Sequence, residues 1–249
     1  ELFSIQLQNR QQQGREGVWL DLPATTEQVQ AALRQIGIAS DNPQALFISG
    51  YFAEEEKRFA IPYNMVLASN VDELNFLAAR LETLSAGERA ELNAALQAPQ
   101  SELSSIGRIT DFPENVDYYV HLPEVHGPAQ LGDYYLNRSG MVDMPEEWKG
   151  GIDTTHFGRY VAQQEQGAFT QYGYLVKSGD EWQKVHEGQP VPEKYRVLSF
   201  PAPEILRDAA NIPPPVQPET EPQKVLPIIL NGKDSAERMK EITDRLETG

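Results

Sequence analysis

Residues 17–37 read GVWLDLPATTEQVQAALRQIG, and this stretch decides the fold of the first part of the chain. Its first half is mostly apolar and stops at Pro23, as a strand does when it ends at a proline. Thr25 then precedes Gln28 by three residues, which is the spacing of a helix-capping box. Apolar residues recur at helical spacing over residues 29–36, and a glycine follows them. The stretch therefore predicts a strand that leads at once into an amphipathic helix.

Short strands surround this helix in a predicted first domain, residues 1–68. Apolar and polar residues alternate over Phe3–Leu7, and the apolar runs Ala45–Ile48 and Phe59–Ile61 also have strand character. The order strand, strand, helix, strand, strand predicts a small mixed α/β domain with one helix on a face of a sheet.

A helical domain is predicted for residues 69–108 from two helix starts. Asn70 lies three residues before Glu73, and Ser85 lies three residues before Glu88, so both pairs match a capping pattern. Leucines follow each start at helical spacing. The simplest interpretation is two helices joined by a tight corner.

A second mixed α/β domain is predicted for residues 109–200, with an added hairpin at its end. Three helices are predicted in it, at Leu131–Leu136, Pro145–Trp148 and Asp153–Val161. The helix that starts with Leu131–Leu136 is expected to stop at Gly140. Strand character is found in Ala168–Val176 and in the two halves of the hairpin, Trp182–Val185 and Tyr195–Phe200. The predicted fold class is therefore α+β.

The last part of the chain, residues 201–249, has the composition of a linker followed by a short helix. Eight of the 18 prolines lie between residues 201 and 227, which favours an extended segment without packing. Beyond them, Met239, Ile242 and Leu246 share one face of a short amphipathic helix. Because so short a helix is marginal alone, we expect it to belong to a neighbouring domain or to dock on one.

Patterns of catalysis and metal binding are absent from the sequence. The chain has no cysteine, which excludes disulfides and thiolate chemistry and favours a reducing, cytoplasmic compartment. It has neither a phosphate-binding glycine loop nor a nucleophile elbow, and its four histidines lack the spacing of zinc ligands. No apolar run approaches the ~20 residues that span a membrane. We therefore predict no enzyme activity, no cofactor and no metal site.

Charge is the informative feature of the composition. The chain carries 37 acids against 21 bases, a net charge of −16, which repels nucleic acid and anionic membranes and attracts basic partners. The excess is concentrated in residues 72–165, which hold 16 acids and six bases. The candidate acidic surface consists of these acids: Asp72, Glu73, Glu82, Glu88, Glu91, Glu102, Asp111, Glu114, Asp117, Glu124, Asp133, Asp143, Glu146, Glu147, Asp153 and Glu165.

Composition alone leaves two interpretations of these acids open. Many proteins are acidic for solubility, and a run of charge is usually a solvated face. Alternatively, acids fixed on a folded surface mimic the phosphates of DNA. Duplex DNA carries about one charge per 1.7 Å, so the 24 acids of residues 1–177 would match roughly 40 Å of duplex, or roughly 20 Å after the 12 bases are subtracted.

Four segments in a fixed order resemble the ArdA family of antirestriction proteins over residues 3–177. The first is Gly17–Pro23 with the helix that follows, and the second is Asp72–Leu84 with its partner Ser85–Leu96. The third consists of Leu131–Leu136, Met144–Trp148, Ile152–Asp153 and Phe157–Arg159. The fourth is Gly167–Tyr174. The C-terminal part departs from this family. Two of its segments resemble the start of an ArdC-like antirestriction module, namely Pro227–Leu230 and Met239–Glu247. This similarity suggests a larger fusion protein.

The resemblance implies an elongated row of three small domains without catalytic residues, metal or cofactor. It also implies a homodimer whose acidic surface imitates bent DNA and occupies the DNA site of type I restriction-modification enzymes. Such a protein protects incoming mobile DNA and binds neither nucleic acid nor membrane itself. We predict Tyr134, Tyr135 and Trp148 as dimer contacts. The alternative function is an interaction or scaffold module of a larger conjugative-element protein, whose acids are scattered and do not share one face.

Overall fold

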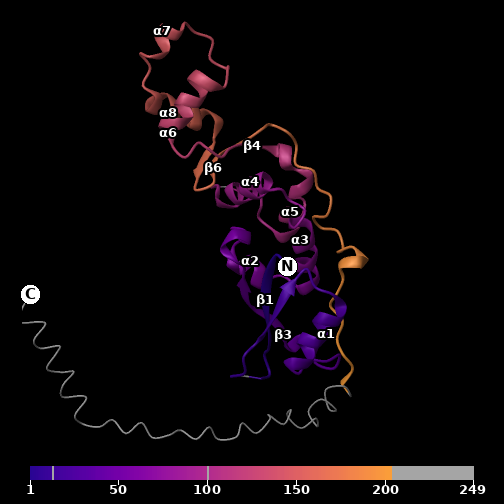
Figure 1. Ribbon diagram of the computed structural model, residues 1–249. Coiled ribbons are helices and arrows are strands. Elements are labelled where there is room, and N and C mark those ends of the chain that lie inside the picture. Colours follow the sequence, from indigo (N-terminus) through magenta and orange to yellow (C-terminus); the bar gives the residue numbers. More distant parts are fainter. Residues whose placement is uncertain (13, 100, 204–249) are drawn as a thin grey trace, which may run out of the picture. The chain divides into compact units, whose positions relative to one another are not determined.

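Two small antiparallel sheets and eight α-helices form the part of the chain that the computed structural model describes, residues 1–12, 14–99 and 101–203 (Figure 1). The predicted α+β class is therefore confirmed. Most of the predicted linker, the C-terminal helix and the ArdC-like segment lie outside the described residues. Within the described ranges, no helix is both long enough and apolar enough to cross a membrane. The division into three domains and their order in a row stay predictions.

The first sheet contains β1 (Phe3–Asn9), β2 (Val18–Leu22) and β3 (Leu46–Phe52) in the order β2-β1-β3, with both pairs antiparallel. Side chains alternate between the two faces of a strand, and the buried face of β1 includes Ile5 and Leu7, which are both fully buried. All three strands were predicted near these bounds, and β3 continues further than its apolar run indicated.

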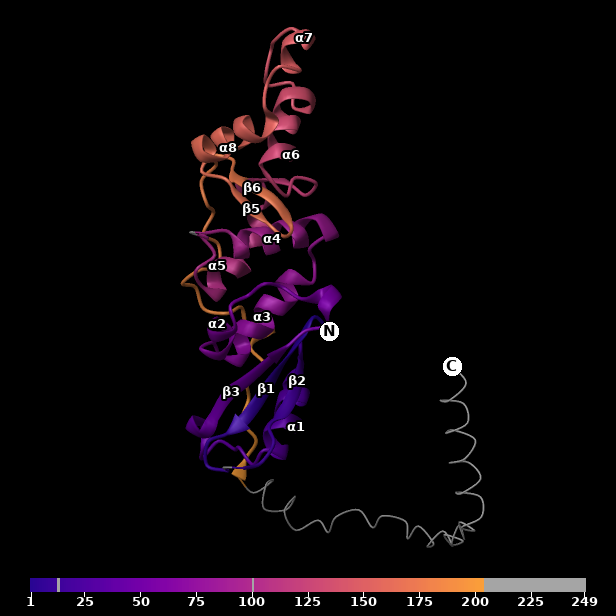
Figure 2. The same cartoon turned by 90° about the vertical axis from the view of Figure 1, so that its left-hand side faces the viewer.

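Helix α1 (Thr26–Gln35) packs against this sheet (Figure 2). Its predicted capping box is present: the Thr25 hydroxyl accepts from the N–H of Gln28, and the Gln28 side chain accepts from the N–H of Thr25. Gly37 follows with φ +69°, a left-handed conformation that favours glycine after a helix. The apolar stripe of the helix, which includes Leu33, is buried in the core shared with the sheet.

Four helices follow β3: α2 (Tyr63–Leu67), α3 (Val71–Leu81), α4 (Ala86–Gln97) and α5 (Ile106–Thr110). Helices α3 and α4 are the two that were predicted. Helix α2 lies in the range predicted for the first domain, and α5 was not predicted. Both predicted helix starts are confirmed: Asn70 caps α3 and Ser85 caps α4, each accepting from the backbone N–H three residues further on. A continuous hydrophobic core joins these helices to the first sheet.

The run Phe59–Ile61 is not a strand, so this prediction is wrong. The side chain of Asn93, on α4, accepts from the N–H of Ala60 at 2.7 Å and donates to the carbonyl oxygen of Arg58 at 3.2 Å. A side-chain amide from the helical region thus provides the hydrogen bonds that a neighbouring strand would otherwise supply.

The second sheet contains β4 (Tyr119–Leu122), β5 (Ala168–Thr170) and β6 (Gly173–Lys177) in the antiparallel order β4-β6-β5. The run predicted as strand over Ala168–Val176 is therefore a tight hairpin. Its turn needs glycine, because Gly173 has φ +115° and a Cβ there would lie 2.5 Å from the carbonyl oxygen of Leu122. Helix α4 packs against both β4 and β6.

Three further helices lie in the chain between β4 and β5. They are α6 (Pro128–Asp133), α7 (Glu146–Lys149) and α8 (Thr154–Glu165). All three were predicted; α6 continues as a π-helical turn, Tyr134–Arg138, and the chain then leaves the helix at Gly140, which has φ +71°.

Helices α6 and α8 cross in close backbone contact through two glycines. A Cβ on Gly132 would lie 1.9 Å from the carbonyl oxygen of Thr154, and a Cβ on Gly158 would lie 1.9 Å from that of Pro128. Neither position has room for a side chain, so the pair fixes how closely the two helices approach.

Residues 178–203, orange in Figure 1, form a segment that we call the strap. All of its residues are described, and it contains one 3₁₀ turn, Glu193–Tyr195, and no strand. The predicted hairpin strands Trp182–Val185 and Tyr195–Phe200 are therefore wrong. The strap passes from β6 along α5 and α3 to α1 (Figure 1). Many of its backbone N–H and C=O groups form hydrogen bonds with side chains of earlier elements and not with a second strand.

The first part of the strap is held by an amide and an aromatic ring. Asn115 donates to the carbonyl oxygen of Gln183 at 2.9 Å and accepts from its N–H at 2.7 Å. The ring of Phe76, on α3, packs against His186 and Tyr195, with centroids 4.9 and 4.7 Å apart. Phe76 therefore connects two points of the strap to the core.

The last part of the strap is held by a carboxylate and by backbone bonds. Asp72 accepts from the N–H groups of Val197 and Leu198, both at 2.8 Å. The carbonyl oxygen of Pro201 accepts from the N–H of Ser40 at 3.0 Å. Val197 is buried in the main core, so this end of the strap is part of the folded unit.

Candidate acidic interaction surface

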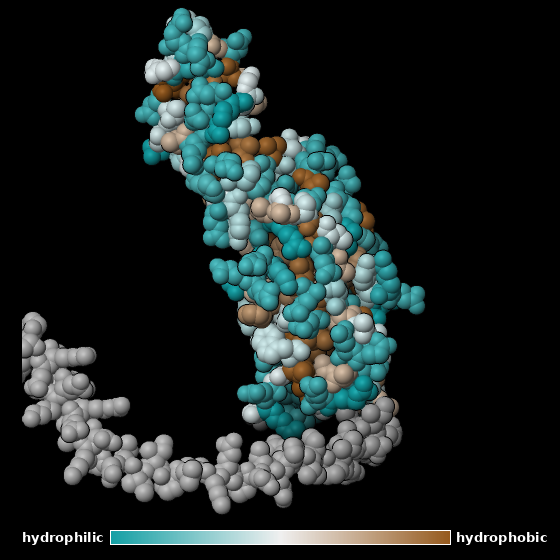
Figure 3. Space-filling view, viewed as in Figure 1, coloured by the Kyte–Doolittle hydropathy of each residue, from teal (hydrophilic) through white to brown (hydrophobic). Residues whose placement is uncertain are grey.

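The 16 candidate acids divide equally by exposure. The exposed ones are Glu73, Glu82, Asp117, Glu124, Asp143, Glu146, Glu147 and Asp153. The half-buried or buried ones are Asp72, Glu88, Glu91, Glu102, Asp111, Glu114, Asp133 and Glu165. Hydrophilic residues cover most of the face seen in Figure 3, yet the sequence overstates how much charge the candidate set displays.

Five exposed acids form no ion pair and no side-chain hydrogen bond with the described residues, and we call them the unpaired acids. They are Glu73, Asp117, Glu124, Asp143 and Glu147. The other three exposed acids have internal partners: Glu82 accepts from the backbone nitrogen of Glu1 at 3.3 Å, Glu146 contacts Lys149 at 3.1 Å, and Asp153 accepts from the N–H of His156 at 2.9 Å. Among the 16 candidates, the unpaired acids are the carboxylates most available to a basic partner.

Three half-buried acids are paired with internal bases, and one of them, Asp133, contacts Arg138 at 3.4 Å. Glu102 contacts Lys177 at 2.5 Å and Arg108 at 2.8 Å, and the hydrogen bond from Lys177, followed by that from Arg108, lowers the pKa of its carboxyl group. Glu114 forms an ion pair with Arg80. The bases cancel these charges locally, so Glu102 and Glu114 contribute to the fold more than to an external potential.

Glu165 at the end of α8 holds two tyrosines. Its carboxylate accepts from the hydroxyl of Tyr135 at 2.5 Å and from that of Tyr174 at 2.9 Å. Burial, followed by these hydrogen bonds, raises the pKa of both phenols. Tyr135 is therefore engaged inside the protein. Of the three predicted dimer contacts, Trp148 is the most available, with 66% of its surface exposed.

Asp111 is fully buried, so its prediction as part of the acidic surface is wrong. Its carboxylate accepts from three successive N–H groups of the strap: Oδ2 from Val185 at 3.2 Å, Oδ1 from His186 at 2.6 Å, and Oδ2 from Glu187 at 3.1 Å. A buried carboxylate is stable in this position because the backbone donors replace its hydration. We infer that Asp111 fixes the strap to the end of α5.

Asp111, Glu114 and His186 bring potential ligand atoms within 4.8 Å of one another, a grouping of a kind that can hold a metal ion. Two of the three groups already have strong partners, since Asp111 accepts from the strap backbone and Glu114 pairs with Arg80. A cation there would also lie beside the Arg80 guanidinium. We therefore assign this cluster to fixing the strap.

Glu91, on α4, is half-buried, and its Oε1 is buried without a hydrogen-bond partner in the described residues. Burial, followed by repulsion from Glu88 and Asp117, raises the pKa of its carboxyl group to about 8. The group is therefore mostly protonated near pH 7, and it adds little to the negative charge of the surface.

The range chosen from the sequence, residues 72–165, leaves out an exposed acidic run. Glu54, Glu55 and Glu56 are all exposed, and of the three only Glu54 has an ion pair within the described residues, to Lys57 at 3.3 Å. Three consecutive acids are visible in the sequence. They were missed because the candidate set was selected by the density of charge over a long window.

One comparison with known proteins identifies the family. The model of the family described as antirestriction protein (ArdA) matches residues 13–176, which is more than half of the 249 residues. The chain belongs to the ArdA family. This confirms the resemblance, and ArdA membership implies an antirestriction protein. The ArdA match includes all five unpaired acids and ends before the strap begins. A search among curated proteins found no match.

Proposed function

We propose that this ArdA-family protein is an antirestriction DNA mimic. Its exposed carboxylates take the place of phosphates in the DNA-binding site of a type I restriction-modification enzyme. The observation that carries the proposal is the set of five unpaired acids, all inside the ArdA match. Lys and Arg side chains that bind phosphate also bind carboxylate through charge-assisted hydrogen bonds. Binding of this kind competes directly with DNA.

The dependence of inhibition on salt concentration is the first property expected of such an inhibitor. Exposed charge pairs are screened within about 10 Å at 0.1 M salt. We expect inhibition to weaken as salt rises. The slope need not equal that of DNA, because a protein surface carries no layer of condensed counterions.

Neutralising unpaired acids is expected to weaken inhibition. The triple variant Asp117→Asn, Glu124→Gln, Glu147→Gln removes three charges without changing side-chain size. If each acid makes one exposed ion pair, the half-inhibitory concentration should rise roughly tenfold. The measurement is cleavage of a DNA substrate by a purified type I restriction enzyme, titrated with the wild-type protein and the variant at two salt concentrations.

The matched control changes the same charge outside the family match. The triple variant Asp180→Asn, Glu181→Gln, Glu193→Gln alters three exposed strap acids and should shift the half-inhibitory concentration less than about twofold. Equal loss in both triples would mean that net charge, and not a particular surface, inhibits the enzyme. No inhibition by the wild-type protein at large excess would leave the alternative, an interaction module of a larger protein.

The same proposal includes a homodimer, with Trp148 of α7 as an anchor. A tryptophan exposed over 66% of its surface is a typical interface residue, because it buries a large apolar area on binding. Tyr134 and Tyr135, whose rings pack at 5.5 Å, are proposed as secondary contacts. A dimer doubles the length of the displayed acidic surface.

Trp148→Ser is expected to shift the protein from dimer to monomer in sedimentation-equilibrium experiments at micromolar concentration. The control is Trp19→Ser, at a tryptophan of the first sheet that is 49% exposed. This control should leave the measured mass unchanged. A wild-type protein that sediments as a monomer over the whole range would remove the dimer from the proposal.

A further inference from the structure

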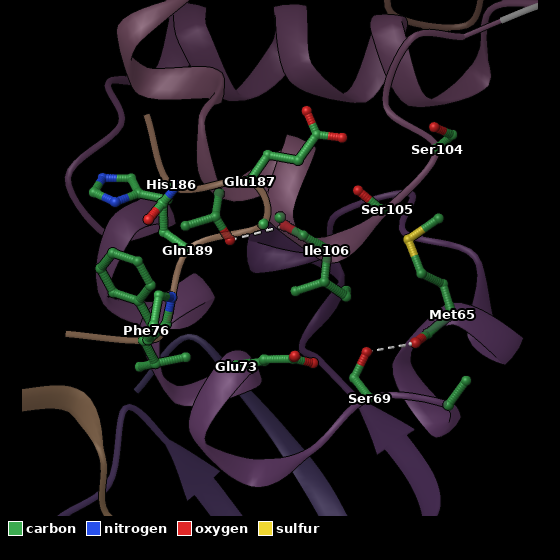
Figure 4. A pocket seen from close by; sticks show the side chains of 16 residues that line it. Met65, Ser69, Glu73, Phe76, Ser104, Ser105, Ile106, His186, Glu187 and Gln189 are labelled. Carbon is green, nitrogen blue, oxygen red and sulfur yellow. Dashed lines mark hydrogen bonds between the residues drawn. The ribbon is translucent and has the colours of Figure 1, made fainter. Parts of the chain in front are cut away.

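A cavity of about 660 Å³ lies where the strap passes helices α2, α3 and α5 (Figure 4). The helices supply Met65, Phe76 and Ile106, and the strap supplies residues 186–191. Because the ArdA match ends at residue 176, one wall of the cavity lies outside the matched region. The cavity is therefore built jointly by the family region and by the segment that follows it.

The lining combines apolar walls with negative charge. Phe76 and Ile106 are almost fully buried and form the floor, while Glu73 and Glu187 supply carboxylates. Among the described residues that line the cavity there is no lysine or arginine. A cavity of this volume accommodates a ligand larger than one side chain. Its chemistry favours a ligand with one cationic and one apolar group.

The two carboxylates differ in the partners that they already have. Glu73 is one of the unpaired acids. Glu187 accepts from Arg108 at 3.2 Å through Oε1, but its Oε2 is buried and forms no hydrogen bond with the described residues, although Lys184 lies 3.5 Å away. Two bases therefore compensate the charge of Glu187, and Glu73 is the carboxylate of the lining that is left for an incoming cation.

The hydroxyl groups of the cavity do not favour an anion. Ser69 donates to the carbonyl oxygen of Met65 at 2.8 Å, a bond drawn in Figure 4. Ser105 accepts from the N–H of Arg108 at 3.2 Å as the cap of α5. Both hydroxyls are thus engaged, and the exposed, unpaired carboxylate of Glu73 in the same lining repels a phosphate or a carboxylate. The sign of the expected ligand is therefore positive.

We propose that this cavity binds a lysine or arginine side chain, together with a neighbouring apolar residue, presented by the partner protein. The basic group bonds to Glu73, and the apolar residue packs on Phe76 and Ile106. That the partner is the restriction enzyme rests on the function proposed above, because an enzyme that binds DNA phosphates has basic side chains in that site. The cavity then adds shape recognition to the charge attraction of the surface.

The binding test uses the full chain and a dipeptide probe, N-acetyl-Leu-Arg-amide, followed by NMR or calorimetry. Its uncharged counterpart is N-acetyl-Leu-citrulline-amide, which has nearly the same shape. We expect saturable binding of the arginine probe, and Glu73→Gln should weaken it roughly threefold to fivefold, the range of an exposed ion pair. The citrulline probe should bind more weakly and should not distinguish wild type from Glu73→Gln.

A charge-neutral variant separates the cavity from the surface charge. Ala68 lines the cavity and is exposed, so Ala68→Phe should fill the space without altering any acid. The control is Ala86→Phe, at an exposed residue of α4 that does not line the cavity. We expect Ala68→Phe to abolish probe binding and to weaken inhibition of the restriction enzyme, and Ala86→Phe to change neither.

The outcomes distinguish this proposal from the proposed function. Absence of probe binding to the wild-type protein at millimolar concentration overturns the cavity proposal, whatever happens to inhibition. Probe binding with full inhibition by Ala68→Phe overturns the claim that the partner uses the cavity, and leaves the DNA-mimic function intact. Probe binding without any inhibition by the wild-type protein supports the chemistry of the cavity and overturns the proposed function.

Discussion

Replacing Asp111 by asparagine is expected to lower the free energy of unfolding by about 3 kcal/mol, because it leaves buried backbone donors without acceptors. Both carboxylate oxygens are used: Oδ1 accepts from His186, and Oδ2 accepts from Val185 and Glu187. An amide keeps one oxygen and places an NH₂ group against the remaining N–H groups. Since the residue is fully buried, water cannot replace the lost acceptor.

Urea denaturation of wild type and Asp111→Asn measures this loss. Asp117→Asn is the matched control, because Asp117 is exposed, has no partner among the described residues, and should change stability by less than about 0.5 kcal/mol. A loss below about 1 kcal/mol in Asp111→Asn would show that these hydrogen bonds do not hold the strap in solution. Because the strap forms one wall of the cavity, the destabilised variant should also bind the dipeptide probe more weakly.

Replacing Glu91 by glutamine is expected to remove a pH dependence of stability. Burial and the carboxylates of Glu88 and Asp117 raise the pKa of Glu91 from the ordinary value of 4.5 to about 8, so the folded chain holds this proton more tightly than the unfolded chain. The contribution is fully present below pH 4.5 and is lost as pH rises to about 8. After an allowance for the solvent that reaches the group, the loss amounts to about 2 kcal/mol.

Glu91→Gln keeps the shape of the side chain and has no charge to bury. It should therefore match wild type near pH 4 and be more stable by about 2 kcal/mol near pH 9, as measured by thermal and urea unfolding across this range. Glu147→Gln, at an exposed acid of α7, is the control and should follow the wild-type profile. If the difference between Glu91→Gln and wild type does not grow with pH, the carboxyl group is better hydrated than its burial indicates.

The two predictions concern acids whose roles cannot be inferred from the residues next to them in the sequence. Asp111 and Glu91 were both counted as displayed charge, yet one accepts from the strap and the other is mostly protonated near pH 7. The charge available for mimicry therefore depends on which acids the fold leaves unpaired. Of the sixteen candidate acids, five remain exposed and unpaired.

The local elements and the family can be predicted from the sequence alone. Helix starts at Thr25, Asn70 and Ser85 were predicted because a capping pattern lies within four consecutive residues. Alternation in β1 and the ArdA-like segments were likewise readable without tertiary information. Each of these features depends on residues that are close together in the chain.

Tertiary structure alone decided which groups are exposed and how the strap is held. The strap was mistaken for a hairpin because its hydrogen bonds go to Asp72, Asp111 and Asn115, which lie 68–126 residues earlier. The prediction of a strand at Phe59–Ile61 was wrong for the same reason, because the side chain of Asn93 forms the hydrogen bonds to the backbone there. Polar side chains that bind distant backbone leave no periodic pattern, so burial, pairing and the cavity became visible only when the chain was folded.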